Sequence, residues 1–211
     1  SRPRPLVDVL NLVKHFTTSS GHVVKAVDDV SFAIPAGETL ALVGESGSGK
    51  TTIGQCLVRL LDSDSGSIVF KNRDILGLPA SAFRAMRRDI QMVFQEPYVA
   101  LNPRWTVEDL IAEPLALDAE LASPATKRAR VREMLDLVRL PERLARVFPH
   151  ELTAGEQKRV GMARALATRP AFVVFDEPTT ALDIRVRAQI IDLIRDLQSR
   201  MQLAALFITH D

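Results

Sequence analysis

The chain has 211 residues, of which 46% are hydrophobic, and its 27 Lys and Arg nearly balance its 26 Asp and Glu. This near-neutral charge argues against a protein that coats nucleic acid, because such a protein needs a basic surface. The single cysteine, Cys56, excludes a disulfide framework within the chain. No apolar run approaches the roughly 18 residues of a membrane-spanning helix, so any function at a membrane is expected to be peripheral.

The first half of the chain is expected to form strands around a glycine-rich turn. Short segments rich in β-branched residues and bounded by turn residues are typical of strands. The glycine-rich turn follows the third of these segments, and residues 52–61 beyond it are expected to form a helix. The expected strands are residues 6–13, 24–34, 38–43, 67–70 and 90–94.

The second half opens with loops and helices and ends in a strand–helix–strand pattern. Helical spacing of apolar residues predicts helices over residues 127–138, 156–167 and 184–200. The wholly apolar run 171–175 is typical of a strand buried on both faces, and residues 203–208 are expected to form another. Strand–helix–strand alternation at both ends of the chain predicts a mainly parallel sheet with crossover helices.

The glycine-rich turn matches the pattern G-x-x-x-x-G-K-[ST] without a mismatch, between an expected strand and an expected helix. Glycines let several backbone N–H groups converge on phosphate oxygens, and the helix N-terminus adds its dipole. Lys50 is expected to reach the β- and γ-phosphates, and the Thr51 hydroxyl to bind Mg²⁺. The expected ATP-binding residues here are Gly44, Glu45, Ser46, Gly47, Ser48, Gly49, Lys50, Thr51 and Thr52.

Two carboxylates, Asp176 and Glu177, follow the apolar strand 171–175. Ligands of open parallel sheets bind at the carboxyl ends of strands, so both side chains are expected near the glycine-rich turn. One carboxylate, Asp176, can hold Mg²⁺, and the other, Glu177, can act as general base toward water. The alternative for this pair is a helix cap or a surface turn after the strand.

These motifs predict an α/β P-loop NTPase fold of the RecA-like type. Its mainly parallel sheet is expected to carry an N-terminal antiparallel β region and an inserted α-helical subdomain. The expected division is residues 1–96 for the first part of the core, 97–158 for the helical subdomain and 159–211 for the rest of the core. Because the chain lacks an initial Met and stops soon after its last strand, we expect a fragment of a longer polypeptide.

Other features complete a pattern that covers nearly the whole chain. Gln95 follows a strand, a segment at 152–156 precedes a helix, Asp183 follows the carboxylate pair, and His210 follows the last strand. Together with the P-loop and the carboxylates, these features resemble the ATPase domains of ABC transporters. Phe16 resembles the aromatic residue that stacks on adenine in that family, although a packed core position is the alternative for it.

The resemblance implies a role for each of these residues. Gln95 corresponds to the Q-loop glutamine, which contacts Mg²⁺ and the attacking water and senses the transmembrane partner. His210 corresponds to the switch histidine and Asp183 to the D-loop aspartate. The metal ligands are then Thr51, Gln95 and Asp176, and the catalytic residues are Lys50, Gln95, Glu177 and His210.

A finer resemblance points to the dipeptide, oligopeptide and nickel importers. It rests on Phe94-Gln95-Glu96-Pro97-Tyr98, Leu101-Asn102-Pro103, Ile111-Ala112-Glu113-Pro114-Leu115, Pro149-His150-Glu151-Leu152 and residues 160–166. It implies uptake of peptides or a related small solute. The implied partners are a second ATPase domain arranged head to tail, transmembrane permease subunits contacted through residues 95–104 and, indirectly, a solute-binding protein, with no nucleic acid. The implied location is the cytoplasmic face of the cell membrane.

The segment that corresponds to the family's signature departs from the family's Leu-Ser-Gly-Gly-Gln. Here it reads Leu152-Thr153-Ala154-Gly155-Glu156, with a Cβ at Ala154 and a negative charge at Glu156. The resemblance implies that this segment faces the γ-phosphate bound by a partner. We hypothesise a weaker partner site and unequal composite sites in a heterodimer. The alternative is a capping box, in which Glu156 at the third helical position bonds back to the backbone at Thr153.

Two other functions remain open at the level of sequence. A soluble ABC ATPase of DNA repair or translation is disfavoured because the distance from Lys50 to Leu152 leaves room for only a small helical subdomain. A nucleotide-gated subunit with a degenerate composite site is favoured by the altered signature and disfavoured by Glu177 and His210.

Overall fold

The N-terminal strands pair into an antiparallel sheet in the computed structural model, which describes residues 3–96 and 102–210. This sheet has the strand order β2-β1-β4-β5. The first strand is longer than expected and continues through Phe16, which pairs with Val24 of the second strand. The strands are β1 (Val7–Thr17), β2 (Val23–Ile34), β4 (Ser65–Phe70) and β5 (Arg73–Asp74).

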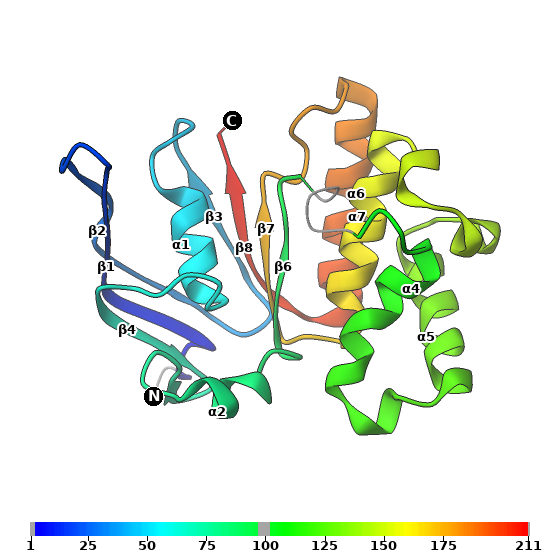
Figure 1. Cartoon of the computed structure of the whole chain (residues 1–211), viewed down its shortest axis with the longest axis horizontal. Coiled ribbons are helices and arrows are strands. Elements are labelled where there is room, and N and C mark those ends of the chain that lie inside the picture. Colours follow the sequence, from blue (N-terminus) through cyan, green and yellow to red (C-terminus); the bar gives the residue numbers. More distant parts are fainter. Residues whose placement is uncertain (1–2, 97–101, 211) are drawn as a thin grey trace.

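A second sheet is wholly parallel and stands in the middle of the molecule (Figure 1). Its strand order is β3-β8-β7-β6, with Val43 opposite Thr209 and Asp176 opposite Ile208. Because neighbouring strands are parallel, their carboxyl ends meet at one edge of the sheet. The expected α/β fold with a parallel sheet is confirmed. The strands are β3 (Thr39–Val43), β6 (Ile90–Val93), β7 (Phe172–Asp176) and β8 (Ala204–Thr209).

The helix after the glycine-rich turn, α1 (Lys50–Leu57), is shorter than the sequence predicted. The expected helix over residues 52–61 is wrong at its end, because Arg59 adopts a left-handed φ of 53°. Its guanidinium donates hydrogen bonds to the carbonyls of Ile75 and Leu78, at 3.1 and 2.8 Å, so tertiary contacts stop the helix. Gly54 lets α1 lie close to the sheet, since a Cβ there would be 3.0 Å from Val174 Cγ1.

Helix α2 (Ala80–Arg84) lies on the side of the antiparallel sheet, and the helices that follow it in the chain gather on the other side of the parallel sheet (Figure 1). The expected helices there are confirmed with small shifts at their ends, whereas α2, α4 and the short 3-10 turns were not predicted. The expected division after residue 158 falls inside α6 and stays a proposal. The helices are α2 (Ala80–Arg84), α4 (Val107–Ala112), η1 (Glu113–Leu117), η2 (Ala119–Leu121), α5 (Pro124–Leu137), η3 (Glu142–Arg146), η4 (Pro149–Glu151), α6 (Ala154–Leu166) and α7 (Ile184–Met201).

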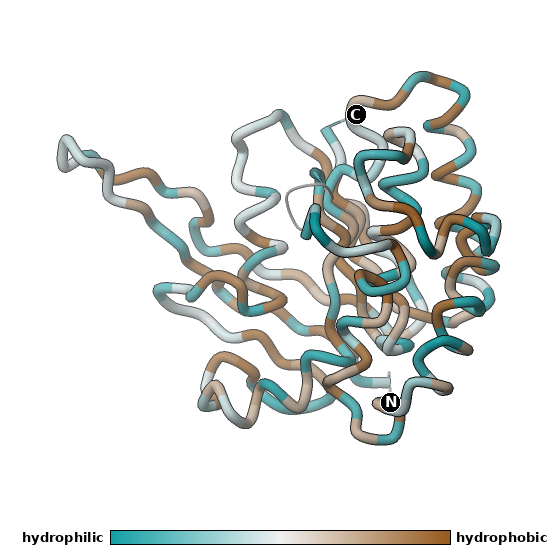
Figure 2. The backbone as a smooth tube through the Cα atoms, turned by 45° about the vertical axis from the view of Figure 1, so that its right-hand side comes forward, coloured by the Kyte–Doolittle hydropathy of each residue, from teal (hydrophilic) through white to brown (hydrophobic). Residues whose placement is uncertain are grey.

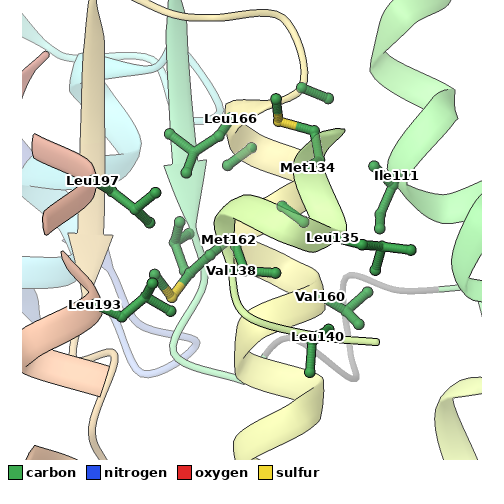
Figure 3. Close-up of a cluster of buried hydrophobic side chains, with 14 of the residues drawn as sticks. Ile111, Met134, Leu135, Val138, Leu140, Val160, Met162, Leu166, Leu193 and Leu197 are labelled. Atoms are coloured by element: carbon green, nitrogen blue, oxygen red, sulfur yellow. The ribbon is translucent and has the colours of Figure 1, made fainter. Parts of the chain in front are cut away.

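Two hydrophobic cores share the parallel sheet, because alternate residues of a strand point to opposite faces. Val173 and Phe175 of β7 belong to the core under the helices, and Phe172 and Val174 belong to the core under the antiparallel sheet and α1. Figure 2, in which the backbone is coloured by hydropathy, shows hydrophobic residues concentrated along the central strands. Figure 3 shows the helix-side core, in which α5, α6 and α7 converge through side chains such as Met162. In the described part of the chain, no helix combines the length and the apolar character needed to cross a membrane.

Candidate functional site

The glycine-rich loop lies at the carboxyl end of β3 and runs directly into α1. Gly49 caps this helix with a left-handed φ of 93°, and a Cβ on it would lie only 1.9 Å from the carbonyl oxygen of Ala26. No other residue fits that position without moving the backbone. Gly47 is also left-handed, but a Cβ there would meet nothing within 4 Å, so its backbone faces open space. The loop is thus tight toward β2 and open toward the site.

The ammonium of Lys50 sits within the loop that precedes it. The residue is buried, and Nζ donates hydrogen bonds to the carbonyl of Gly44, to the carbonyl of Glu45 at 2.6 Å and to Ser48 Oγ at 3.1 Å. All three acceptors are neutral, whereas a phosphate oxygen would give a stronger charge-assisted bond. The ammonium is therefore held where phosphate oxygens can exchange with these acceptors.

Asp176 at the end of β7 meets Thr51 at the start of α1. The Thr51 hydroxyl lies 3.1 Å from both carboxylate oxygens of Asp176 and donates to them. Asp176 is only 2% exposed, and this burial raises the pKa of its carboxyl, while the hydrogen bond from Thr51 opposes the rise. A buried carboxylate is costly without a compensating cation. Hydroxyl and carboxylate oxygens are also ligands that Mg²⁺ prefers, and Mg²⁺ usually takes only one or two carboxylates. The hydroxyl oxygen of Thr51 and the carboxylate oxygens of Asp176 therefore fit Mg²⁺ as ligands.

Glu177 and His210 form a second pair beside the first. His210 Nδ1 lies 2.9 Å from Glu177 Oε1, which joins the ends of β7 and β8. Glu177 is buried and adopts a left-handed φ of 44°, a conformation that is costly for this residue type. Its backbone N–H donates to the carbonyl of Ile208 at 2.9 Å, which holds this conformation. The strained backbone aims the carboxylate at the imidazole.

The loop, Glu177, Gln95 and Phe16 line one hollow of about 590 Å³. Phe16 is 38% exposed, so it is not a packed core residue, and Lys14 Nζ lies 5.2 Å from the centre of its ring. Gln95 also lines a second hollow of about 700 Å³ together with Thr51 and Asp176. The structure thus brings Phe16, Gln95 and Glu177 to the glycine-rich loop (residues 44–51), which forms the cradle for phosphates. The hollow has an aromatic ring on one wall and N–H donors on another, an arrangement that suits a nucleotide, whose nucleobase can stack on the ring while its phosphates accept from the N–H groups.

The segment 153–156 lies at the start of α6 and lines neither of these hollows. It forms the capping box that the sequence offered as the alternative: Thr153 Oγ1 accepts from the Glu156 N–H at 3.2 Å, and Glu156 Oε1 accepts from the Thr153 N–H at 2.9 Å. Close packing accounts for the glycine at position 155, because a Cβ there would lie 2.9 Å from Val186 Cγ1 on α7. Glu156 therefore points back to the backbone, and Ala154 is the first residue of the helix.

Asp183 caps the start of α7, where its Oδ1 accepts from the Val186 N–H at 2.9 Å. This contact gives the residue a structural role, and the D-loop role stays a prediction. Pro97, Tyr98 and Leu101 of the importer-like motif lie outside the described residues.

Lys158 is a site residue that the sequence reasoning missed. It is 6% exposed, and its ammonium donates a hydrogen bond to the main-chain carbonyl of Gln95. The signal was present in the sequence, since Lys158 shares the buried stripe of α6 with Met162 and Ala165, four and seven positions later. A lysine in such a stripe indicates a buried charge with a partner.

The chain as a whole is similar to known proteins. Residues 27–180 match the family described as ABC transporter. The chain is 43% identical over 207 residues to a peptide import ATP-binding protein of Brucella ovis, covering 98% of this chain and 65% of that protein. It is likewise 43% identical to the oligopeptide transport ATP-binding protein of Bacillus subtilis, covering 98% of this chain and 68% of that one.

A solved structure of similar fold is a dimeric ATP-binding cassette in a post-hydrolysis state, bound to ADP and phosphate. The TM-score is 0.88 at 31% sequence identity, over 97% of this chain and 88% of that chain.

Proposed function

This chain belongs to the ABC transporter family, and we propose that it binds MgATP and hydrolyses it to drive the import of peptides or a related small solute. The observation that carries hydrolysis is the Glu177–His210 pair, 2.9 Å apart and adjacent to the Thr51–Asp176 pair. The names of the relatives from Brucella ovis and Bacillus subtilis support a peptide as the solute.

Each group in the hollow has a distinct task in this proposal. Lys50 and the loop N–H groups hold the triphosphate, and Phe16 stacks on adenine. Thr51, Gln95 and Asp176 hold Mg²⁺, which neutralises phosphate charge when it is bound.

Glu177 takes a proton from the attacking water as general base. His210 restrains the Glu177 carboxylate and donates toward the γ-phosphate.

The segment 153–156 serves a second ATPase domain rather than this chain's own hollow. It lies away from the cradle at a helix N-terminus, which is a favourable place for a partner-bound phosphate. The dimeric cassette among the similar structures supports a pair of ATPase domains, for which we propose a head-to-tail arrangement. The pair energises transmembrane permease subunits at the cytoplasmic face of the cell membrane, and a solute-binding protein acts through those subunits.

A second candidate function is a subunit whose composite site is degenerate. The capping box favours it, because the N–H of Glu156 and that of Thr153 are already bonded within the chain. The site completed through Thr153–Glu156 would then turn over more slowly than its counterpart in a heterodimer.

The variant Glu177→Gln tests the proposed hydrolysis. Removing the base should lower ATP turnover by about a hundredfold or more, while the affinity for MgATP stays within about twofold because the cradle is untouched. Turnover is measured by phosphate release from the assembled transporter, and affinity by equilibrium binding of a fluorescent ATP analogue. The control Glu120→Gln makes the same charge change on the exposed surface and should leave both quantities unchanged. Unaltered turnover in Glu177→Gln would remove this residue as the base.

A further inference from the structure

The buried ammonium of Lys158 joins two parts of the molecule that are far apart in sequence. Lys158 lies one turn into α6, and its Nζ donates to the carbonyl of Gln95, just beyond the end of β6. The helix packs against β6, so the contact is made across a shared interface. The side chain of Thr153 caps the start of the same helix. One rigid element thus runs from the segment 153–156 to the backbone of a predicted Mg²⁺ ligand.

This placement of a charge is costly for the fold. Burial lowers the pKa of the Lys158 ammonium, and the carboxylates of Asp176, Glu96 and Glu177 act in the opposite direction. A buried cation is tolerated only with hydrogen bonds and opposite charges nearby. An apolar side chain would fill the stripe of α6 without this cost, so stability alone does not account for a lysine here.

We propose that Lys158 is a positioning residue, which holds the main chain at Gln95 so that the Gln95 side chain meets the metal-bound nucleotide, and so connects α6 to the catalytic site. The inference rests on the proposed role of Gln95 at Mg²⁺. Misplacing a reacting or ligating group by about 1 Å can cost up to about a hundredfold in rate. A shift of α6 when a partner's nucleotide meets the segment 153–156 would act on Gln95 through the same contact.

Three single variants separate positioning from simple stabilisation. Lys158→Met removes the donor and keeps much of the chain length, and Lys158→Gln restores an N–H donor without the charge. The matched control is Arg159→Met on the next residue of α6, because Arg159 Nη1 also donates to a main-chain carbonyl, that of Val138, at 3.0 Å. Both native side chains anchor α6, but only Lys158 anchors it to the site.

Turnover of the assembled transporter and nucleotide affinity with and without Mg²⁺ are the readouts, with thermal unfolding as a check on folding. Lys158→Met should lower kcat about tenfold and reduce the gain in affinity on adding Mg²⁺ about threefold. ATP affinity in the absence of Mg²⁺ should stay within about twofold. Lys158→Gln should recover at least half of the lost turnover on a logarithmic scale. Arg159→Met should lower the unfolding temperature and leave the Mg²⁺ effect intact.

A double-mutant cycle with Gln95→Ala tests whether Lys158 acts through Gln95. Gln95→Ala keeps the carbonyl but removes the side chain, so adding Lys158→Met should cost little more, and the two effects should not add. Additive losses, unchanged kcat in Lys158→Met, or equal losses in Lys158→Met and Arg159→Met would each overturn the proposal. An unaltered Mg²⁺ effect in Gln95→Ala alone would instead refute the proposed metal role of Gln95, which is a separate result.

Discussion

Burial sets the chemical character of several single residues in this chain. It raises the pKa of the Asp176 carboxyl and lowers the pKa of the Lys158 ammonium, and each group has a partner that offsets part of the cost. Cys56 is fully buried without a role in the site, and burial raises the pKa of its thiol to about 11. A thiol with that pKa stays protonated and unreactive at neutral pH.

The stability of the fold should therefore fall at alkaline pH because of Cys56. Its folded pKa is raised, so its stabilising contribution is complete below the ordinary value of 9.0 and is lost as pH rises toward about 11. A shift of this size corresponds to about 3 kcal/mol of unfolding free energy. Urea unfolding of the wild type and of Cys56→Ala between pH 8 and 11, in steps of about half a unit, measures the difference in slope. Parallel pH profiles for the two proteins would contradict the prediction.

At the scale of elements, short polar side chains cap the starts of four helices. Thr106, Ser123, Thr153 and Asp183 each accept a hydrogen bond from a backbone N–H in the first turn of their helix. The cap at Thr153 is the one that also bears on the proposed partner site. Glu156 adds a negative charge there, and the charge opposes an incoming phosphate even though the side chain bonds to the backbone.

Restoring the family's signature residues should make the partner site faster. The variant Thr153→Ser, Ala154→Gly and Glu156→Gln keeps a capping box, since Gln also reaches back, but removes the charge and one Cβ. Charge effects at helix ends are worth about 0.3–1 kcal/mol, so turnover of the full transporter should rise roughly two- to fivefold. Thr153→Ser alone is the control and should change turnover little. No gain in the triple variant would refute the hypothesis of a weakened site.

Local patterns in the sequence predicted the long elements and the motif-borne part of the site. The apolar run 171–175 identified β7, and G-x-x-x-x-G-K-[ST] identified the cradle, because both depend on neighbouring residues. The end of α1 was not predictable, since Arg59 finds its partners at Ile75 and Leu78. Helix α4 has six residues, too few for a clear helical period. The sequence could indicate that Lys158 lies in the buried stripe of α6, but its partner, the Gln95 carbonyl, could not be predicted without knowing what α6 packs against.

At the scale of the whole molecule, the parallel sheet makes the two cores dependent on each other. Each residue of β7 is buried, and successive residues enter opposite cores. Neither core can lose β7 without exposing the other. The antiparallel sheet and the helices therefore stand on one common layer, and the four site elements β3, α1, β7 and β8 belong to that layer or lie directly on it.

This shared layer predicts a single cooperative unfolding transition, and the chain carries one probe for each core. Its only tryptophan, Trp105, packs against the helix-side core, and its only cysteine, Cys56, lies in the other core. Urea midpoints from Trp105 fluorescence and from Cys56 thiol labelling should coincide. Leu135→Ala in the helix-side core should lower the unfolding free energy by about 2–5 kcal/mol and shift both midpoints equally. If only the Trp105 midpoint moved, the helices would unfold separately, and the rigid link from α6 to Gln95 would lose its basis.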